Sequence, residues 1–110
     1  MEIMDQDEKK LNVARAALEY IHNDCILGMG TGSTVNYLIY LIPSIKNKIT
    51  SIASSSIETE RLLRSHGFDV LTLNEIGSLD LYIDGADEAT KNLHLIKGGG
   101  GALTREKILA

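Results

Sequence analysis

The sequence predicts an α/β fold, in which helices cover both faces of a mostly parallel sheet. Short runs of isoleucine, valine and leucine alternate with longer amphipathic segments along the 110 residues. Such apolar runs are typical of parallel strands, which are buried on both sides. Glycine-rich or polar segments directly follow several of these runs, at the positions where ligand-binding loops lie in such sheets. The predicted architecture is therefore Rossmann-like, within a single domain over residues 1–110.

The first predicted element is an amphipathic helix over residues 5–21. Apolar side chains recur there at helical spacing, and Asp5 and Glu8 resemble a capping box at its start. We expect the apolar face to pack against the sheet. This face consists of Leu11, Ala14, Leu18 and Ile21.

Two units of strand, loop and helix follow. Residues 25–27 form the first predicted strand, and after a glycine-rich loop a helix covers residues 35–42. Pro43 helps to end this helix, because it disfavours the helical conformation in the residue before it. The second unit begins with a strand over residues 49–53.

The second helix is expected to start with Ser55 and Glu58 as a capping box and to have Gly67 as its C-cap. Residues 70–73 and 79–83 then read as further buried strands, because both are rich in apolar side chains.

Composition disfavours several classes of partner. The net charge is −4 and the basic residues form no stripe, which argues against binding to nucleic acid. No apolar run is long enough to span a membrane, and the acidic start is unlike a signal peptide. Cys25 is the only cysteine, so a reducing, cytoplasmic compartment is expected. Residues 107–110 form an apolar run with no helix stop signal, which predicts that the domain is incomplete at this end.

The sequence Gly-Met-Gly-Thr-Gly-Ser-Thr at residues 28–34 lies between a predicted strand and a predicted helix. Backbone N–H groups and the helix dipole attract an anion there, and a phosphate is the expected ligand. Ser33 stands where a dinucleotide-binding loop needs its third glycine, and Gly32 stands where a Walker A loop needs lysine. Nicotinamide cofactors and nucleoside triphosphate hydrolysis are therefore disfavoured. The alternative is a purely structural turn.

Three carboxylates follow the apolar run that ends at Ile83, namely Asp84, Asp87 and Glu88. Clustered carboxylates repel one another unless a cation or a hydroxyl-rich ligand binds them. A divalent metal and a sugar both fit this description, and an ordinary acidic turn is the alternative. The three histidines are dispersed, and we expect surface or packing roles for them rather than metal binding: His22, His66 and His94.

Four consecutive glycines follow Lys97, after a shorter apolar stretch at residues 93–96. Their N–H groups can form a nest for an oxyanion, and Lys97 adds positive charge. Residues 104–107 are predicted to open a helix that holds Glu106 near this loop. A carboxylate beside an oxyanion nest suits proton abstraction next to a carbonyl, although Glu106 could equally be a solvated helix residue. We expect the three loops to converge on one rim of the sheet.

Four motifs together resemble the type A ribose-5-phosphate isomerases, in order and in spacing: residues 28–34, Ser-Ser-Ser at 54–56, Asp-Gly-Ala-Asp-Glu at 84–88, and Lys-Gly-Gly-Gly-Gly-Ala-Leu-Thr-Arg-Glu-Lys at 97–107. The resemblance begins at about Lys10. It implies interconversion of ribose 5-phosphate and ribulose 5-phosphate in the pentose phosphate pathway, without metal or organic cofactor. It also implies homodimers or homotetramers at full length, and that the small C-terminal α/β lobe lies beyond this chain.

By position, the resemblance makes Glu106 the general base that moves a proton between C1 and C2 of the opened sugar. Lys97 would stabilise the enediolate together with the backbone of Gly98, Gly99 and Gly100. Asp84 and Asp87 would bind sugar hydroxyls and assist ring opening. The remaining implied substrate contacts are Lys10 (or its neighbour Lys9), Thr31, Gly32, Ser33, Thr34, Gly85 and Ala86.

Other functions share this architecture. Sugar-phosphate sensor domains of bacterial transcription regulators have a similar fold, but they normally follow a helix-turn-helix, and only one helix precedes the first predicted strand here. Amino-sugar phosphate deaminases and CoA transferases fit the motifs less well. The isomerase is therefore the preferred interpretation, and a non-catalytic sensor domain is the alternative.

Overall fold

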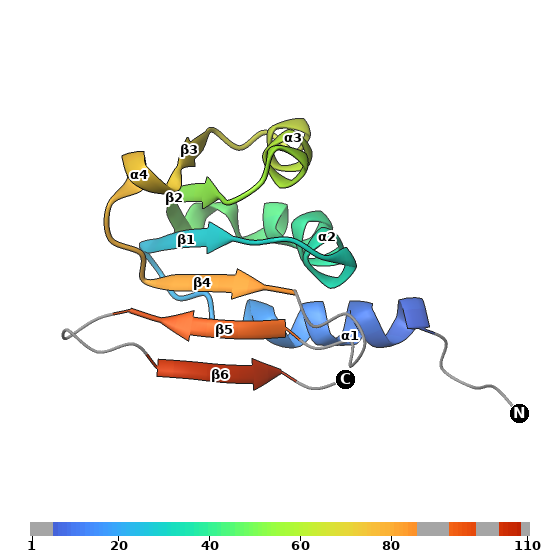
Figure 1. The fold of residues 1–110 in the computed structure, drawn as a ribbon. Coiled ribbons are helices and arrows are strands. Elements are labelled where there is room, and N and C mark those ends of the chain that lie inside the picture. The colour runs from blue at the N-terminus through green and yellow to red at the C-terminus, as the bar shows by residue number, and fades with distance from the viewer. Residues whose placement is uncertain (1–5, 86–92, 99–103, 109–110) are drawn as a thin grey trace, which may run out of the picture.

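The computed structural model describes residues 6–85, 93–98 and 104–108. These residues form one six-stranded sheet with the strand order β3-β2-β1-β4-β5-β6 (Figure 1). The strands are β1 (Cys25–Met29), β2 (Ile49–Ser54), β3 (Val70–Thr72), β4 (Leu81–Asp84), β5 (Leu93–Lys97) and β6 (Thr104–Ile108). The helices are α1 (Gln6–Leu18), α2 (Ser33–Leu41), the 3₁₀ helix η1 (Ile42–Lys48), α3 (Ile57–Ser65) and α4 (Leu73–Ile76).

The first four strands run in the same direction. β1 lies between β2 and β4 and pairs with both in parallel, and β2 pairs in parallel with β3. β5 is antiparallel to both of its neighbours, β4 and β6. The predicted α/β fold with a mostly parallel sheet is therefore confirmed.

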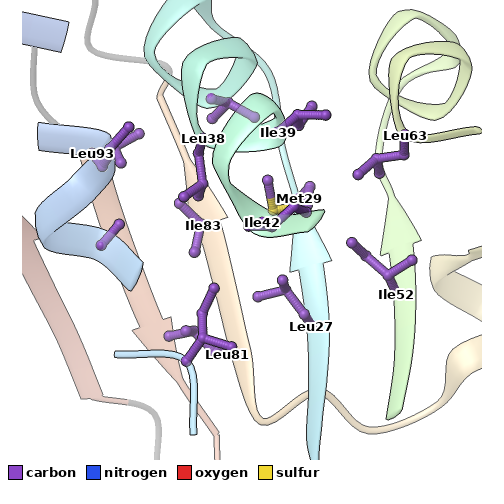
Figure 2. Close-up of a cluster of buried hydrophobic side chains, with 14 of the residues drawn as sticks. Leu27, Met29, Leu38, Ile39, Ile42, Ile52, Leu63, Leu81, Ile83 and Leu93 are labelled. Atoms are coloured by element: carbon purple, nitrogen blue, oxygen red, sulfur yellow. The ribbon is translucent and has the colours of Figure 1, made fainter. Parts of the chain in front are cut away.

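The core lies between the sheet and a layer formed by α1 and α2, which pack against each other. Side chains alternate along β1, so that Leu27 and Met29 enter the core together with Ile83 of β4 (Figure 2). From α2, Leu38 and Ile39 close over these residues and are fully buried. Opposite α2, α1 contributes alanines and a valine: Val13, Ala14 and Ala17. These small side chains allow the two helices to approach closely.

The start of α3 differs from the prediction by one residue. Ser56, and not Ser55, is the N-cap, and its hydroxyl accepts a hydrogen bond from the backbone N–H of Thr59 at 3.1 Å. The helix ends at the C-cap His66, and Gly67 follows with φ +90°. Phe68 N–H then donates to the carbonyl of Leu63 at 3.2 Å. This closure satisfies carbonyls of the last turn, and the glycine is required because of its positive φ.

Several predicted elements have different bounds in the structure; α1, for example, ends at Leu18 and not at Ile21, and β4 begins at Leu81 and not at Leu79. Pro43 lies in the first turn of the 3₁₀ helix η1 that continues from α2, where its missing N–H is tolerated. Residues 70–73 are not a buried strand: β3 is the edge strand of the sheet, and Leu71 and Thr72 are exposed. Leu73 already belongs to α4, which begins at a capping box formed by Thr72 and Glu75.

The largest correction concerns the end of the described chain. Residues 104–108 do not open a helix but form β6, with Glu106 opposite Leu95 of β5. The unpaired backbone edge of β5 explains this outcome, because pairing with it satisfies the N–H and C=O groups of both segments. Residues 1–5, including the predicted cap Asp5, lie outside the described residues.

Candidate functional site

The loop after β1 and the end of β4 are joined by three hydrogen bonds. Gly30 N–H donates to the carbonyl of Ile83 at 2.7 Å, and Gly85 N–H donates to the carbonyl of Thr31 at 2.9 Å. Thr31 N–H donates to Oδ1 of Asp84 at 3.2 Å. The backbone pairing of β1 with β4 thus continues beyond the strands, and it brings Asp84 and Gly85 to the glycine-rich loop as the sequence predicted.

Two glycines of the loop after β1 are required because Asp84 and Gly85, at the end of β4, lie very close to them. A Cβ at Gly30 would collide with the Asp84 carboxylate. Gly32 has φ +116°, and a Cβ there would meet the carbonyl oxygen of Gly85. A larger residue at Gly32 would push the two backbones apart, whereas one at Gly30 would displace the Asp84 side chain.

The N-terminus of α2 opens at this loop. Gly32 is the N-cap and provides no side-chain hydrogen bond, and the first turn contains no acidic residue. The N–H groups of the first turn therefore present positive potential without an internal counter-charge. Ser33 is half-buried at this end, whereas the Thr34 side chain is fully buried. Thr34 can thus meet a ligand through its backbone N–H and not through an exposed hydroxyl.

The loop after β2 and the start of α3 also form hydrogen bonds to the end of β1 and to the loop after it. Ser55 N–H donates to the carbonyl of Met29 at 3.1 Å. The buried hydroxyl of Thr59 in α3 donates to the carbonyl of Gly30 at 2.8 Å. Sequence reasoning missed Thr59, although its position three residues after Ser56 is the usual partner of a cap.

A pocket of about 570 Å³ lies between these elements, at the carboxyl ends of β1 and β2. The first loop, α2 and α3 contribute its lining, which consists of Thr31, Gly32, Ser33, Asn36, Ser56, Glu58, Thr59, Arg61, Leu62 and Ser65. Asn36 and Arg61 were not predicted from the sequence, because no local pattern marks them as facing this loop. Hydroxyl groups, a guanidinium and helix N–H groups together are suited to a phosphorylated ligand.

Lys97 and Gly98, at the start of the four-glycine segment, do not lie at the same rim of the sheet. Because β5 is antiparallel to β4, Lys97 pairs with Leu81 and His94 pairs with Asp84. Lys97 therefore lies three residues, or about 10 Å, from the level of Asp84 along the strands. The expectation that all three loops converge is wrong for Lys97 and Gly98, since it assumed a parallel β5.

Lys97 and Gly98 instead line a second pocket of about 400 Å³, together with Asp80 and Leu81 at the start of β4. Lys97 Nζ lies 4.9 Å from the centroid of the Tyr20 ring. Gly98 N–H donates to the carbonyl of Asp80 at 3.0 Å. These contacts hold the end of β5 against the residue that follows α1 by two positions and against the segment that precedes β4.

Some of the other predicted site residues belong to the described part of the chain, and the rest lie outside it. The backbone of Glu106 lies in β6. Lys10 is half-buried in the first half of α1, and α1 begins on the side of the sheet where β1 and β4 end (Figure 1). The positions that lie outside the described residues are Ala86, Asp87, Glu88, Gly99, Gly100 and Gly101. Within the described residues, no helix has the length and apolar character needed to cross a bilayer.

Comparison with known proteins gives consistent matches. The family model described as ribose 5-phosphate isomerase A (phosphoriboisomerase A) matches residues 51–110. Ribose-5-phosphate isomerase A of Legionella pneumophila strain Corby is 52% identical over 103 residues, and the same holds for that of strain Lens. The match covers 94% of this chain and 48% of each relative. The chain thus spans about half the length of these curated relatives.

Solved structures of the same kind share the fold. Ribose 5-phosphate isomerase A from Neisseria gonorrhoeae has a TM-score of 0.72 and 38% identity, over 92% of this chain and 45% of that chain. The enzyme from Methanocaldococcus jannaschii has a TM-score of 0.65 and 32% identity, over 88% and 44%. A D-ribose-5-phosphate isomerase in complex with phospho-erythronic acid has a TM-score of 0.67 and 34% identity, over 88% and 44%. The chain belongs to the ribose-5-phosphate isomerase A family.

Proposed function

We propose that the protein interconverts D-ribose 5-phosphate and D-ribulose 5-phosphate, as a step of the pentose phosphate pathway in the cytoplasm. Membership of the family and the names of its relatives support this activity. The structural observation that carries it is the pairing of the Gly30–Gly32 loop with Asp84 beside a pocket lined by hydroxyls and helix N–H groups. None of the matches supports the sensor alternative.

The phosphate would bind at the N-terminus of α2. Its first turn carries no acidic residue, and Thr31, Gly32 and Ser33 line the pocket. Backbone N–H groups, including that of Thr34, would donate to phosphate oxygens. The solved complex of a relative with phospho-erythronic acid supports a phosphorylated ligand. Lys10, or Lys9 beside it, would add a cation from α1.

Asp84 would bind sugar hydroxyls and help to open the ring. Thr31 N–H already orients one oxygen of its carboxylate, and an ionised carboxylate has further acceptor sites for hydroxyl groups. Gly85 and Ala86 would allow the sugar to approach the backbone, and Asp87 would contribute a second carboxylate.

The proton transfer would use the segment from Lys97 to Glu106. Glu106 would move the proton between C1 and C2 of the open-chain sugar. Lys97 and the N–H groups of Gly98, Gly99 and Gly100 would stabilise the enediolate oxygens, without metal or organic cofactor. The described register keeps Lys97 at the opposite end of β4 from Asp84. The proposal therefore requires this segment to be rearranged in the active protein, which we further propose to be a homodimer or homotetramer at full length.

An isomerase assay on the protein carrying Glu106→Gln tests the proposal. We expect turnover to fall by orders of magnitude while substrate binding is largely retained, because only the base is removed. Glu60→Gln is the matched control, since Glu60 forms only an exposed ion pair with Arg64 on α3. Full activity of the Glu106→Gln protein would refute the assigned base. Absence of isomerase activity in the unsubstituted full-length protein would refute the function itself.

A further inference from the structure

Three side chains with metal-binding atoms gather at the amino ends of β1 and β4, the opposite end of these strands from the candidate active site. They are His22, in the loop before β1, Cys25, the first residue of β1, and Asp80, directly before β4. One donor atom from each lies within 4.8 Å of the other two. In the described part of the chain, no other group of three or more histidine, cysteine or acidic residues is this close together.

Asp80 is held in place from both neighbouring strands. Its N–H donates to the carbonyl of Ile26 at 2.8 Å, and its carbonyl accepts from Gly98 N–H at 3.0 Å. Its carboxylate Oδ2 accepts from Ile26 N–H at 2.9 Å. An ionised carboxylate retains further lone pairs after accepting one hydrogen bond. Asp80 can therefore ligate a cation without giving up the contact that orients it.

His22 has a tautomer suited to metal binding. Its Nδ1 lies 2.8 Å from the carbonyl oxygen of Asn23. Because a carbonyl can only accept, Nδ1 carries the hydrogen and Nε2 of the neutral ring carries the lone pair. Metal-bound histidines typically donate their other ring N–H to a carbonyl or carboxylate in this way.

Cys25 is fully buried next to a carboxylate. Its Sγ atom lies within 4.8 Å of a ligand atom of both His22 and Asp80. A divalent cation bound between these atoms would take the place of the thiol proton, because a coordinated thiol is deprotonated.

We propose that His22, Cys25 and Asp80 form a binding site for a zinc-type divalent transition metal ion. A set of one sulfur, one nitrogen and one oxygen ligand suits Zn²⁺ better than Mg²⁺ or Ca²⁺, which prefer oxygen ligands. On binding, the sulfur–metal bond replaces the S–H bond of Cys25, and one proton leaves to solvent.

The geometry requires only a small closure. Tetrahedral zinc places neighbouring ligand atoms about 3.4–3.6 Å apart, so the donor atoms have to approach by about 1 Å. The second pocket, of about 400 Å³, is lined by both His22 and Asp80 and can supply water as the fourth ligand. Two carboxylates, those of Glu19 and Asp80, line this pocket against the single ammonium group of Lys97, so the fixed charges around the open position favour a cation.

Titration of the 110-residue chain with Co²⁺ tests the site. Cys25 is the only cysteine, so any thiolate-to-cobalt charge-transfer band in the near ultraviolet belongs to it. We expect a band that saturates at one equivalent, is displaced by Zn²⁺, and is absent in Cys25→Ser. His22→Gln and Asp80→Asn should weaken cobalt binding by about tenfold or more.

The controls separate this site from simple thiol chemistry. His22 is exposed, so its replacement by glutamine does not disturb the core. His66→Gln changes a histidine that packs on Tyr40 instead, and should leave the titration unchanged. The absence of the charge-transfer band would overturn the proposal. A band of undiminished affinity in both His22→Gln and Asp80→Asn would also overturn it, because the metal would then bind the thiol alone.

Discussion

The backbone N–H of Thr31 donates to the carboxylate of Asp84 at 3.2 Å, although 53 positions separate the two residues in the chain. This hydrogen bond joins the loop after β1 to the end of β4. The glycine-rich loop and Asp84, which the sequence places in separate motifs, are therefore neighbours in the structure.

Asp84→Asn separates the chemical role of Asp84 from its structural one. Asparagine can still accept from Thr31 N–H, so we expect the free energy of unfolding to change by less than about 1 kcal/mol. Loss of the negative charge should lower kcat/KM for ribose 5-phosphate by about a hundredfold or more. Steady-state kinetics and urea unfolding provide the two measurements. Asp69→Asn is the control, because Asp69 is exposed and lies before β3. Normal kinetics of the Asp84→Asn protein would contradict its placement in the site.

Gly32→Ala should destabilise the fold more than Gly77→Ala. Both glycines have positive φ, +116° and +76°, but only at Gly32 would a Cβ meet another backbone atom, the carbonyl oxygen of Gly85. Around Gly77 no atom lies within 4 Å of the added Cβ. We expect a loss of about 1 kcal/mol at Gly77 and about 3 kcal/mol or more at Gly32. Urea unfolding measures both, and equal losses would show that the loops are not in close contact.

Ser56→Ala tests which serine caps α3. The Ser56 hydroxyl accepts from Thr59 N–H, so its removal should lower the free energy of unfolding by about 1 kcal/mol. Ser55 only accepts from the hydroxyl of Tyr82, at 3.2 Å, so Ser55→Ala should have the smaller effect. Thermal or denaturant unfolding of the two variants decides the question. A larger loss for Ser55→Ala would restore the cap predicted from the sequence.

Stability should depend on pH through Glu75. Its hydrogen bonds to Thr72, first with the backbone and then with the side chain, lower the pKa of the Glu75 carboxyl below 4.5. The folded state therefore favours the ionised form, so the stabilisation is present above pH 4.5 and is lost as the pH falls through the lower folded pKa. We expect the stability advantage of the native protein over Glu75→Gln to shrink steadily below pH 4.5. Denaturant midpoints at a series of pH values measure this. An advantage that is constant down to the lowest pH would exclude this explanation.

Local sequence patterns predicted the elements around β1 and β2 well. Apolar runs mark the strands there, glycine or serine residues mark the loops, and helical spacing of apolar residues marks the helices. The direction of β5 was not predicted, since Leu93 and Leu95 enter the core equally well from a parallel or an antiparallel strand. A signal did exist: residues 85–92 are fewer than the dozen that a parallel crossover usually needs. For Thr104–Ile108, the charged side chains favour a helix locally, but pairing with β5 overrides this propensity.

The positions of the candidate site residues divide in the same way. That Thr31 and Gly32 follow β1 and that Asp84 ends β4 could be predicted, because each belongs to a motif that follows an apolar run. Asn36 and Arg61 reach the pocket from helix faces that only the tertiary arrangement brings together. The same holds for Asp80 beside Cys25, since 55 positions separate them and no spacing rule relates them.

Main-chain hydrogen bonds from Gly30 and Gly85 hold the two loops together. Their arrangement therefore depends little on which side chains line the pocket. Asn36 and Arg61 are exposed positions on helices that the core anchors from the other side. Substitutions at these two positions should therefore change the lining of the pocket while the main-chain pairing that positions Asp84 stays the same.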